Sequence, residues 1–293
     1  MIQSITRFCK ATFASVVLAV NTVVGFTLMI PFVIAKLLLP FTFVRKICDT
    51  GLRTIAETWI GVNCFWMNTV GRTRWHVSGH DQFPYQGWYL VSANHQSWVD
   101  ILVLQWVFNR RIPLLKFFIK HELIYVPIIG LCWWALDFPF MKRRGGASAQ
   151  KDLETARKAC EKFRVIPTSV ISFMEGTRFT KGKHAQQKSP YQNLLKAKTG
   201  GVCMALETMG DMFNCLVDVT IVYPHGIPTF TDLLTGNLEE VVVKVREVPI
   251  PKIVLLNEKG EPASRQVVQA WVDEMWTAKD REITEIKASF SRQ

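Results

Sequence analysis

The sequence predicts an α/β fold: a mostly parallel central sheet flanked by helices, with an N-terminal membrane helix or helical hairpin. Short apolar runs at 88–93, 168–174 and 215–224 are typical of buried strands. Amphipathic helical patterns alternate with these runs, and this alternation favours parallel strand pairing. An uncharged N-terminal stretch is the third observation. We therefore expect a membrane-embedded segment over residues 1–48 and a second domain over residues 49–293.

The N-terminal stretch from Ala11 to Ala35 contains no charged residue. About 25 residues at ~1.5 Å each are enough for a helix to cross a ~30 Å hydrocarbon core. A signal peptide would have a shorter apolar part and a small-x-small cleavage site, which we do not find. Pro31 interrupts a simple span because proline lacks a backbone N–H. Residues 11–44 are therefore expected to form either one span or a broken hairpin, and basic residues at both ends leave the orientation undecided.

The remaining elements follow from periodicity and turn residues. We expect helices at 54–71, 99–108, 148–164, 193–209 and 264–287, and strands at 73–79, 88–93, 168–174, 215–224 and 239–250.

The composition is apolar and aromatic, with 49% hydrophobic residues, a mean hydropathy of +0.14, 10 Trp and 19 Phe. Aromatic rings with one wet and one apolar edge suit a membrane interface. The alternative is a soluble core rich in tryptophan.

The net charge of +11 is compatible with nucleic acid, an anionic membrane surface or an acidic carrier protein as partner. The basic residues are spread along the chain, which argues against nucleic acid. The seven cysteines include no C-x-x-C pair and predict reduced thiols without a zinc cluster.

The stretch "NHQSWVD" places His95 and Asp100 between an apolar strand and an apolar helix. Ser97 with Asp100 also fits a capping box, so a purely structural interpretation is available. On one continuous helix, residues five apart lie ~140° apart. If His95 lies in the turn before the helix, Asp100 can reach back and orient its imidazole. His76 and Asp81 have the same spacing but begin within a strand pattern, so we interpret them as non-catalytic.

The stretch "FMEGTRFT" places Glu175, Gly176, Thr177 and Arg178 directly after a predicted strand. Glycine permits a tight turn, and the planar guanidinium of arginine matches phosphate oxygens. The alternative is a solvated turn with an incidental ion pair.

Basic residues also interrupt the apolar segment from 113 to 144, at Lys116, Lys120, Arg143 and Arg144. A charge in such a setting requires an anionic partner or water. The two interpretations are an anion site and side chains that extend to a membrane or solvent face. Neither G-x-S-x-G nor a nucleotide phosphate loop occurs in the chain.

Four stretches in order, "NHQSWVD", "KHEL" with "FPFMKR", "EGTRF" and "IVYP", resemble the sequence blocks of the glycerolipid acyltransferases. Within that family they are most similar to the lysophosphatidic acid acyltransferases (1-acylglycerol-3-phosphate O-acyltransferases). The resemblance covers roughly residues 75 to 230. Phe179 after "EGTR" and the sequence "VYPHG" depart from the usual pattern and resemble a side branch of bacterial and some eukaryotic members.

The resemblance implies roles for individual residues. His95 would be the general base that deprotonates a glycerol hydroxyl, and Asp100 would orient it. Trp133, Trp134 and Phe138 would line the route of the acyl chain or face lipid. The residues that would hold the acceptor phosphate are Glu175, Gly176, Thr177, Arg178, Lys120 and Arg143.

The resemblance also implies transfer of an acyl chain from a thioester of coenzyme A or acyl carrier protein to a lysophospholipid, lysophosphatidic acid first. No metal, cofactor or covalent acyl-enzyme is expected. The expected surroundings are anionic lipids of a bacterial inner membrane, with the catalytic domain facing the cytoplasm and no nucleic acid partner. The alternatives are another acceptor, such as glycerol 3-phosphate or a lysophospholipid with a headgroup, and a catalytically inactive protein that binds anionic membranes.

Overall fold

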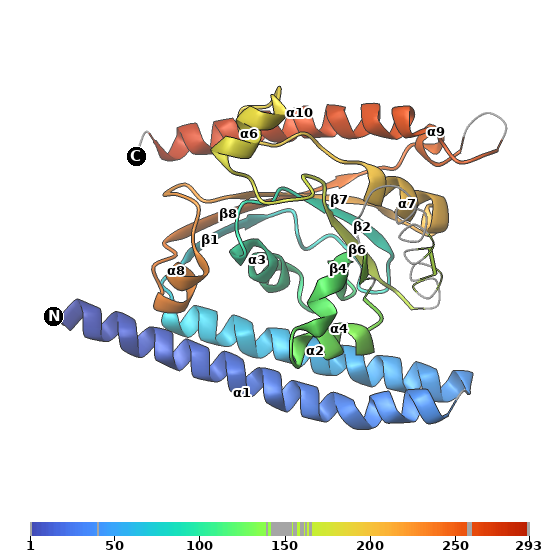
Figure 1. The fold of residues 1–293 in the computed structure, drawn as a ribbon. Coiled ribbons are helices and arrows are strands. Elements are labelled where there is room, and N and C mark those ends of the chain that lie inside the picture. Colours follow the sequence, from blue (N-terminus) through green and yellow to red (C-terminus); the bar gives the residue numbers. More distant parts are fainter. Residues whose placement is uncertain are drawn as a thin grey trace.

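A computed structural model describes residues 2–39, 41–138, 140–141, 154, 157–158, 161, 163, 166–256 and 260–291. A twisted sheet forms the centre of the molecule. Two long N-terminal helices lie on one side of it and the long C-terminal helix on the other (Figure 1).

The main sheet has six strands in the order β1-β8-β7-β2-β6-β3. All neighbouring pairs are parallel except β7 with β8. A parallel pair, β4 and β5, forms a separate small sheet. The strand bounds are β1 Arg74–Ser78, β2 Tyr89–Ala93, β3 Leu115–Phe117, β4 Ile119–Lys120, β5 Phe140–Met141, β6 Ser169–Phe173, β7 Cys215–Val222 and β8 Glu240–Val248.

Helices cover both faces of the sheet (Figure 1). On one side lie α1, α2, α3, α4 and α8, and on the other lie α6, α7, α9 and α10. The helix bounds are α1 Ile2–Leu38, α2 Thr42–Val70, α3 Val99–Phe108, the 3₁₀ helix η1 His121–Tyr125, α4 Ile129–Ala135, α6 Lys181–Gln187, α7 Gly200–Met209, α8 Phe230–Thr235, α9 Lys252–Leu255 and α10 Arg265–Phe290.

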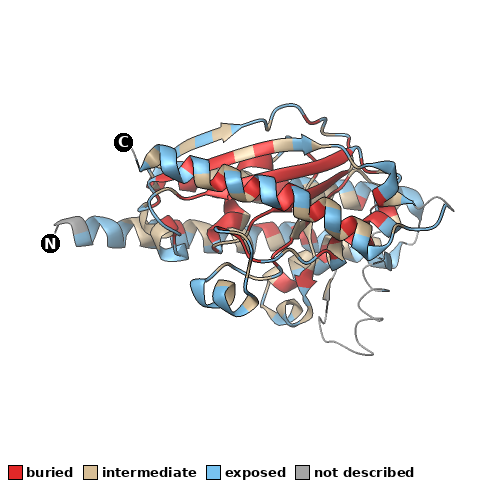
Figure 2. Cartoon of the chain, turned by 90° about the horizontal axis from the view of Figure 1, so that it is seen from above, coloured by how far each residue is buried: buried red, intermediate tan, exposed pale blue. Residues whose placement is uncertain are grey.

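The central strands are buried on both faces, as Figure 2 shows. Every residue of β2 and of β7 is buried. Val103 of α3 and Trp66 of α2 belong to the core on one face, while Trp276 of α10 and Val202 of α7 belong to the core on the other. Strands covered on both sides are nearly continuous apolar runs, which is the pattern that predicted them.

The two N-terminal helices form an antiparallel hairpin (Figure 1). The ring of Phe32 occupies the space in which a Cβ at position 51 would lie, only 2.5 Å from Cε1, so Gly51 permits the close approach. Helix α1 continues through Pro31. Among the described residues, Ser4–Leu38 is the one helix long and apolar enough to cross a membrane, judged by length and composition.

The predicted α/β class, with a mostly parallel sheet and a long apolar N-terminal helix, is confirmed. Several details differ, among them the short strands β3, β4 and β5, which were not predicted. The antiparallel β7–β8 pair was not predicted. Helix α7 begins at Gly200, because residues 193–198 continue an irregular connection into the site. Helix α2 runs through residue 48, so the division into domains at that point stays a prediction. Most of the helix predicted at 148–164 lies outside the described residues.

Candidate active site

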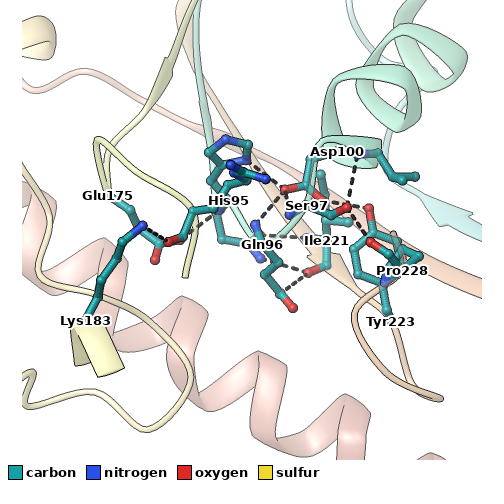
Figure 3. A network of polar contacts seen from close by, with 12 residues as sticks. His95, Gln96, Ser97, Asp100, Glu175, Lys183, Ile221, Tyr223 and Pro228 are labelled. Carbon is teal, nitrogen blue, oxygen red and sulfur yellow. Dashed lines mark hydrogen bonds and ion pairs between the residues drawn. The ribbon is translucent and has the colours of Figure 1, made fainter. Parts of the chain in front are cut away.

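Three parallel strands end at the same edge of the sheet. In the registers, Ala93 of β2 lies beside Phe173 of β6 and Val219 of β7. The chain segments that leave these strands therefore meet, although they are far apart in the sequence. Polar residues follow each strand, and their contacts form the candidate site (Figure 3). Ligands of open α/β folds commonly bind at this edge.

His95 and Asp100 form a direct pair at the end of β2. Nδ1 of His95 lies 2.8 Å from Oδ2 of Asp100. The carboxylate is fully buried, whereas 14% of the His95 side chain is exposed. An imidazole held by a buried carboxylate and partly exposed to solvent has the arrangement of a general base.

The first turn of α3 fixes the Asp100 carboxylate. The backbone N–H groups of Gln96 and Ser97 donate to Oδ2 at 2.6 and 2.8 Å. The Ser97 hydroxyl accepts from the N–H of Val99 at 3.2 Å, so only one half of the predicted capping box forms. The carboxylate thus completes a helix start and holds the imidazole at the same time.

The end of β7 and the residue that follows it also support Asp100 and the turn at His95. The hydroxyl of Tyr223 donates to Oδ1 of Asp100 at 2.6 Å. Burial, and then the nearby Asp100 carboxylate, raise the pKa of Tyr223 well above its ordinary value, so the hydroxyl remains a donor. Asn94 exchanges two 2.8 Å hydrogen bonds with the backbone of Ile221, which joins the ends of β2 and β7.

The His95 ring stacks on Phe173, the last residue of β6, with centroids 4.0 Å apart and an interplanar angle of 15°. Because a carboxylate oxygen only accepts hydrogen bonds, the contact with Oδ2 of Asp100 is made by the His95 tautomer that carries a proton on Nδ1. In the neutral form of that tautomer, Nε2 is the ring nitrogen without a proton. This is the nitrogen that can take a proton from a substrate.

Glu175 is buried and binds the backbone on both sides of the site. Its Oε1 accepts from the N–H of His95 at 2.8 Å, and its Oε2 accepts from the N–H of Leu195 at 3.1 Å. Burial raises its pKa to about 7, although both hydrogen bonds act in the opposite direction. The predicted contact of Glu175 with the acceptor phosphate stays a prediction. With no exposed surface, Glu175 joins the loop after β2 to the connection before α7.

The loop after Glu175 presents groups suited to an anion. Gly176 has a φ of +67°, a conformation that favours glycine. Nζ of Lys183 lies 2.7 Å from Oγ1 of Thr177 and 3.1 Å from the carbonyl oxygen of Arg178. The exposed guanidinium of Arg178 lies over the Trp98 ring, 4.8 Å from its centroid.

The other predicted site residues lie farther along the chain. Lys120 on β4 is exposed and has Glu122 at 3.7 Å. On α4 and just after it, Trp134 is 45% exposed, Trp133 is half-buried and Phe138 is buried. Arg143 and Arg144 lie outside the described residues. Their assignments to a phosphate or to an acyl chain stay predictions.

The structure shows no group of three or more His, Cys, Asp or Glu side chains placed to hold a metal ion within the part of the chain that it describes. The cysteines at positions 9, 48, 64, 132, 203 and 215 are free thiols, and Cys160 lies outside the described residues.

Several residues of this site were not expected from the sequence. Asn94, Phe173, Tyr223 and Lys183 were not predicted to contribute. Tyr223 lies within the quoted block "IVYP", and a buried tyrosine directly after an apolar strand was the available signal. Phe173 and Asn94 carry no comparable signal, because their roles depend on strand pairing.

The Acyltransferase family model matches residues 74–227, which is just over half of the chain and includes the whole His95–Asp100 and Glu175–Arg178 region. The chain belongs to the Acyltransferase family. This agrees with the predicted resemblance.

Two acyltransferases illustrate the similarity of this chain to curated relatives. The mouse 1-acyl-sn-glycerol-3-phosphate acyltransferase delta is 27% identical over 205 residues, covering 65% of this chain and 51% of the relative. The 1-acyl-sn-glycerol-3-phosphate acyltransferase 3 of Arabidopsis thaliana is 27% identical over 210 residues, covering 66% and 52%. The chain thus spans about half the length of these relatives.

A solved structure has a similar fold over nearly the whole chain. The crystal structure of the 1-acyl-sn-glycerophosphate (LPA) acyltransferase PlsC from Thermotoga maritima matches with a TM-score of 0.57. It is 19% identical in sequence, and the match covers 95% of this chain and 98% of that chain. The shared fold therefore includes the N-terminal helices as well as the sheet.

Proposed function

We propose that this protein is an O-acyltransferase that moves a fatty acyl chain from a thioester donor to the free hydroxyl of lysophosphatidic acid, giving phosphatidic acid. The observation that carries the proposal is the His95–Asp100 pair, with its 2.8 Å hydrogen bond and its partly exposed imidazole. The family membership and the printed activities of the relatives support it.

In the proposed reaction, Nε2 of His95 takes the proton of the acceptor hydroxyl as its oxygen attacks the thioester carbonyl carbon. The tetrahedral intermediate collapses with release of the thiolate, which takes up the proton from the imidazolium. Asp100 stabilises the imidazolium, because its buried carboxylate lies against Nδ1. These steps use no metal and no covalent acyl-enzyme.

The acceptor phosphate is proposed to bind beside the exposed guanidinium of Arg178 and the loop at Gly176 and Thr177. Lys183 supports this loop through its hydrogen bond to the hydroxyl of Thr177. A fixed phosphate holds the glycerol hydroxyl near His95 and so raises its effective concentration. Lys120 and Arg143 remain proposed contributors to the same phosphate.

The proposed location is a membrane surface, with α1 embedded and anionic lipids nearby. Its support is the exposed apolar face of α1, which includes Phe8, Val16, Val20 and Leu28. The bacterial inner membrane and the cytoplasmic orientation stay predictions, as does the choice between coenzyme A and acyl carrier protein as the donor.

The test is acyl transfer by purified wild type, His95→Ala and His76→Ala in detergent, read by mass spectrometry. Acyl-coenzyme A and then acyl carrier protein are supplied as donors, with lysophosphatidic acid, other lysophospholipids and glycerol 3-phosphate as acceptors. A product made by wild type and His76→Ala, but not by His95→Ala, supports the proposal, and the favoured acceptor names the substrate. Equal product from all three proteins contradicts the role of His95. Membrane binding without turnover on any donor supports the alternative of an inactive lipid-binding protein.

A different acceptor is the second candidate. The observation that favours it is the loop after Arg178, where Phe179 is followed by Lys181 and Lys183. Additional basic groups beside the proposed phosphate position suit a headgroup with more than one negative charge.

A further inference from the structure

A cavity of about 590 Å³ lies at the opposite edge of the sheet from His95. Thr168 is part of its lining and directly precedes β6, whereas the catalytic pair follows the other end of the neighbouring strand β2. The six residues from Thr168 to Phe173 are separated by five steps of ~3.3 Å and so span about 17 Å along the strand. The cavity is therefore separate from the candidate active site.

The wall of the cavity combines one face of α2 with apolar residues from other elements. Leu52 of α2, Leu114 before β3, and Leu136 after α4 form an apolar part of the lining. Leu52 belongs to a small core shared by α1, α2 and α4. An acyl chain or a glycerol backbone can contact this part without loss of hydrogen bonds.

The acidic groups near the hairpin turn are partly neutralised from within the protein. Nζ of Lys36, near the end of α1, lies 2.7 Å from Oδ1 of Asp49 and 2.5 Å from Oδ2 of Asp137. Both aspartates line the cavity. Lys36 offsets one of these two negative charges, so the aspartates can cancel at most one of the basic residues of the same wall. Lys158 and Glu161 add one charge of each sign.

The remaining charges are basic. Arg45, Lys46, Arg53 and Lys116 all line the cavity. Arg45 reaches Asp49 only at 3.9 Å, and about half of its side chain is exposed. Within the described part of the chain, the buried Nε of Arg53 has no hydrogen-bond acceptor, and the nearest carboxylate oxygen, on Glu57, is 4.0 Å away. A cationic wall with an unsatisfied guanidinium donor favours a multidentate oxyanion such as a phosphate.

The surface next to the cavity is apolar and exposed. Leu38, Phe41, Phe43 and Ile47, at the turn between α1 and α2, are 49–74% exposed. Thr42, in the same turn, lines the cavity. A ligand that combines a phosphate with acyl chains would place its headgroup in the cavity and its chains on this surface. A bare phosphate would use only the charged part.

We propose that this cavity binds the phosphate headgroup of an anionic glycerophospholipid, at a second lipid site apart from the catalytic pair. The inference rests on the membrane association stated under the proposed function but not on acyl transfer. The bound lipid would hold the hairpin turn against α4 and the start of β3, since residues of all three line the cavity.

The test uses the full chain in neutral detergent, titrated calorimetrically with dihexanoyl-phosphatidylserine, a soluble anionic lipid without a free hydroxyl to acylate. Arg45→Gln with Lys46→Gln is expected to weaken binding about tenfold or more, because two charges near the headgroup are lost. The control is Arg72→Gln with Lys252→Gln, which removes the same charge at two exposed positions outside the cavity lining. It is expected to bind like the wild type.

Three results would overturn the inference. The first is equal binding by the wild type and the Arg45/Lys46 variant, or an equal decrease in the control. The second is loss of binding on Arg178→Gln alone, which would place the lipid in the proposed acceptor site. The third is competition by inorganic phosphate as strong as that by the lipid, or equal binding of dihexanoyl-phosphatidylcholine. Either would remove the assignment to an anionic lipid headgroup. Acyl transfer is not measured here, so its absence would leave the result unaffected.

Discussion

Two histidine–aspartate pairs with the same spacing have different surroundings in this protein. His95 and Asp100 contact one another directly. His76 instead lies 2.7 Å from Oε1 of Glu240, and Asp81 lies near His80, at 3.1 Å. Identical spacing therefore gives one directly bonded pair and two residues that contact other partners.

The difference follows from the elements that carry each pair. β1 is an edge strand with exposed alternate positions, so His76 points outward beside the partner strand β8. β2 is a central strand that ends at Ala93, two residues before His95. Helix α3 begins at Val99, four residues after His95, so Asp100 in its first turn reaches back to the imidazole. Asp100 is fully buried, while the side chain of Asp81 is 77% exposed. A buried carboxylate with several donors is preorganised, and an exposed one is not.

The strongest way to test this comparison is to remove each histidine. We expect His95→Ala to lower kcat by about 10²- to 10⁴-fold, because the general base is lost. We expect His76→Ala to change the rate by less than about twofold, as for most surface substitutions. Initial rates of acyl transfer measure both. Comparable losses in the two variants would remove the distinction between the pairs.

The second test concerns the buried carboxylate beside His95. Burial raises the pKa of Glu175 from 4.5 to about 7, so the folded state holds the proton more tightly than the unfolded state. Its contribution to stability is complete below about pH 4.5 and is lost as the pH rises through about 7, on the order of 3 kcal/mol in total. Glu175→Gln lacks this titration. Urea unfolding at pH 5 and pH 8 should show a larger decrease in the wild type than in the variant, and parallel changes would contradict the assignment.

A third, smaller effect is expected from the support of Asp100. Tyr223→Phe removes the 2.6 Å hydrogen bond to Oδ1 and is expected to lower kcat about tenfold, with KM little changed. Tyr85→Phe is the matched control, since its hydroxyl also donates to a carboxylate, that of Glu57. A similar decrease in both variants would indicate a general effect on folding rather than on the pair.

The smallest effect is expected at Glu240, the carboxylate that contacts His76. Glu240 accepts hydrogen bonds from Arg74, His225 and His76, and the first of these contributes most to lowering its pKa to about 2. Its stabilisation is present above about pH 4.5 and is lost as the pH falls through about 2. Glu240→Gln should therefore lower Tm slightly at pH 6 and by less at pH 3, with unchanged acyl transfer. A large loss of activity would show that this cluster, too, supports catalysis.

Much of the fold could be predicted from local sequence. The runs at 88–93 and 215–224 became central strands because they are apolar at every position, and burial on both faces requires this. The start of α7 was predicted too early. Residues 193–195 are apolar or amide side chains, but the backbone of Leu195 bonds Glu175 and so leaves the helical path. Local propensity cannot anticipate a partner 20 residues away.

The sequence by itself determined the alternation of the main strands and helices along the chain and the apolar N-terminal helix. It also determined that His95, Asp100 and the loop after β6 follow predicted strands. These depend on periodicity and composition, which act locally. Only the tertiary structure decided that Glu175 binds backbone instead of facing solvent, that Tyr223 holds Asp100, and that His76 pairs with Glu240. Each of these contacts joins segments far apart in the sequence that belong to or follow different strands and helices, and their proximity depends on the order and register of the sheet.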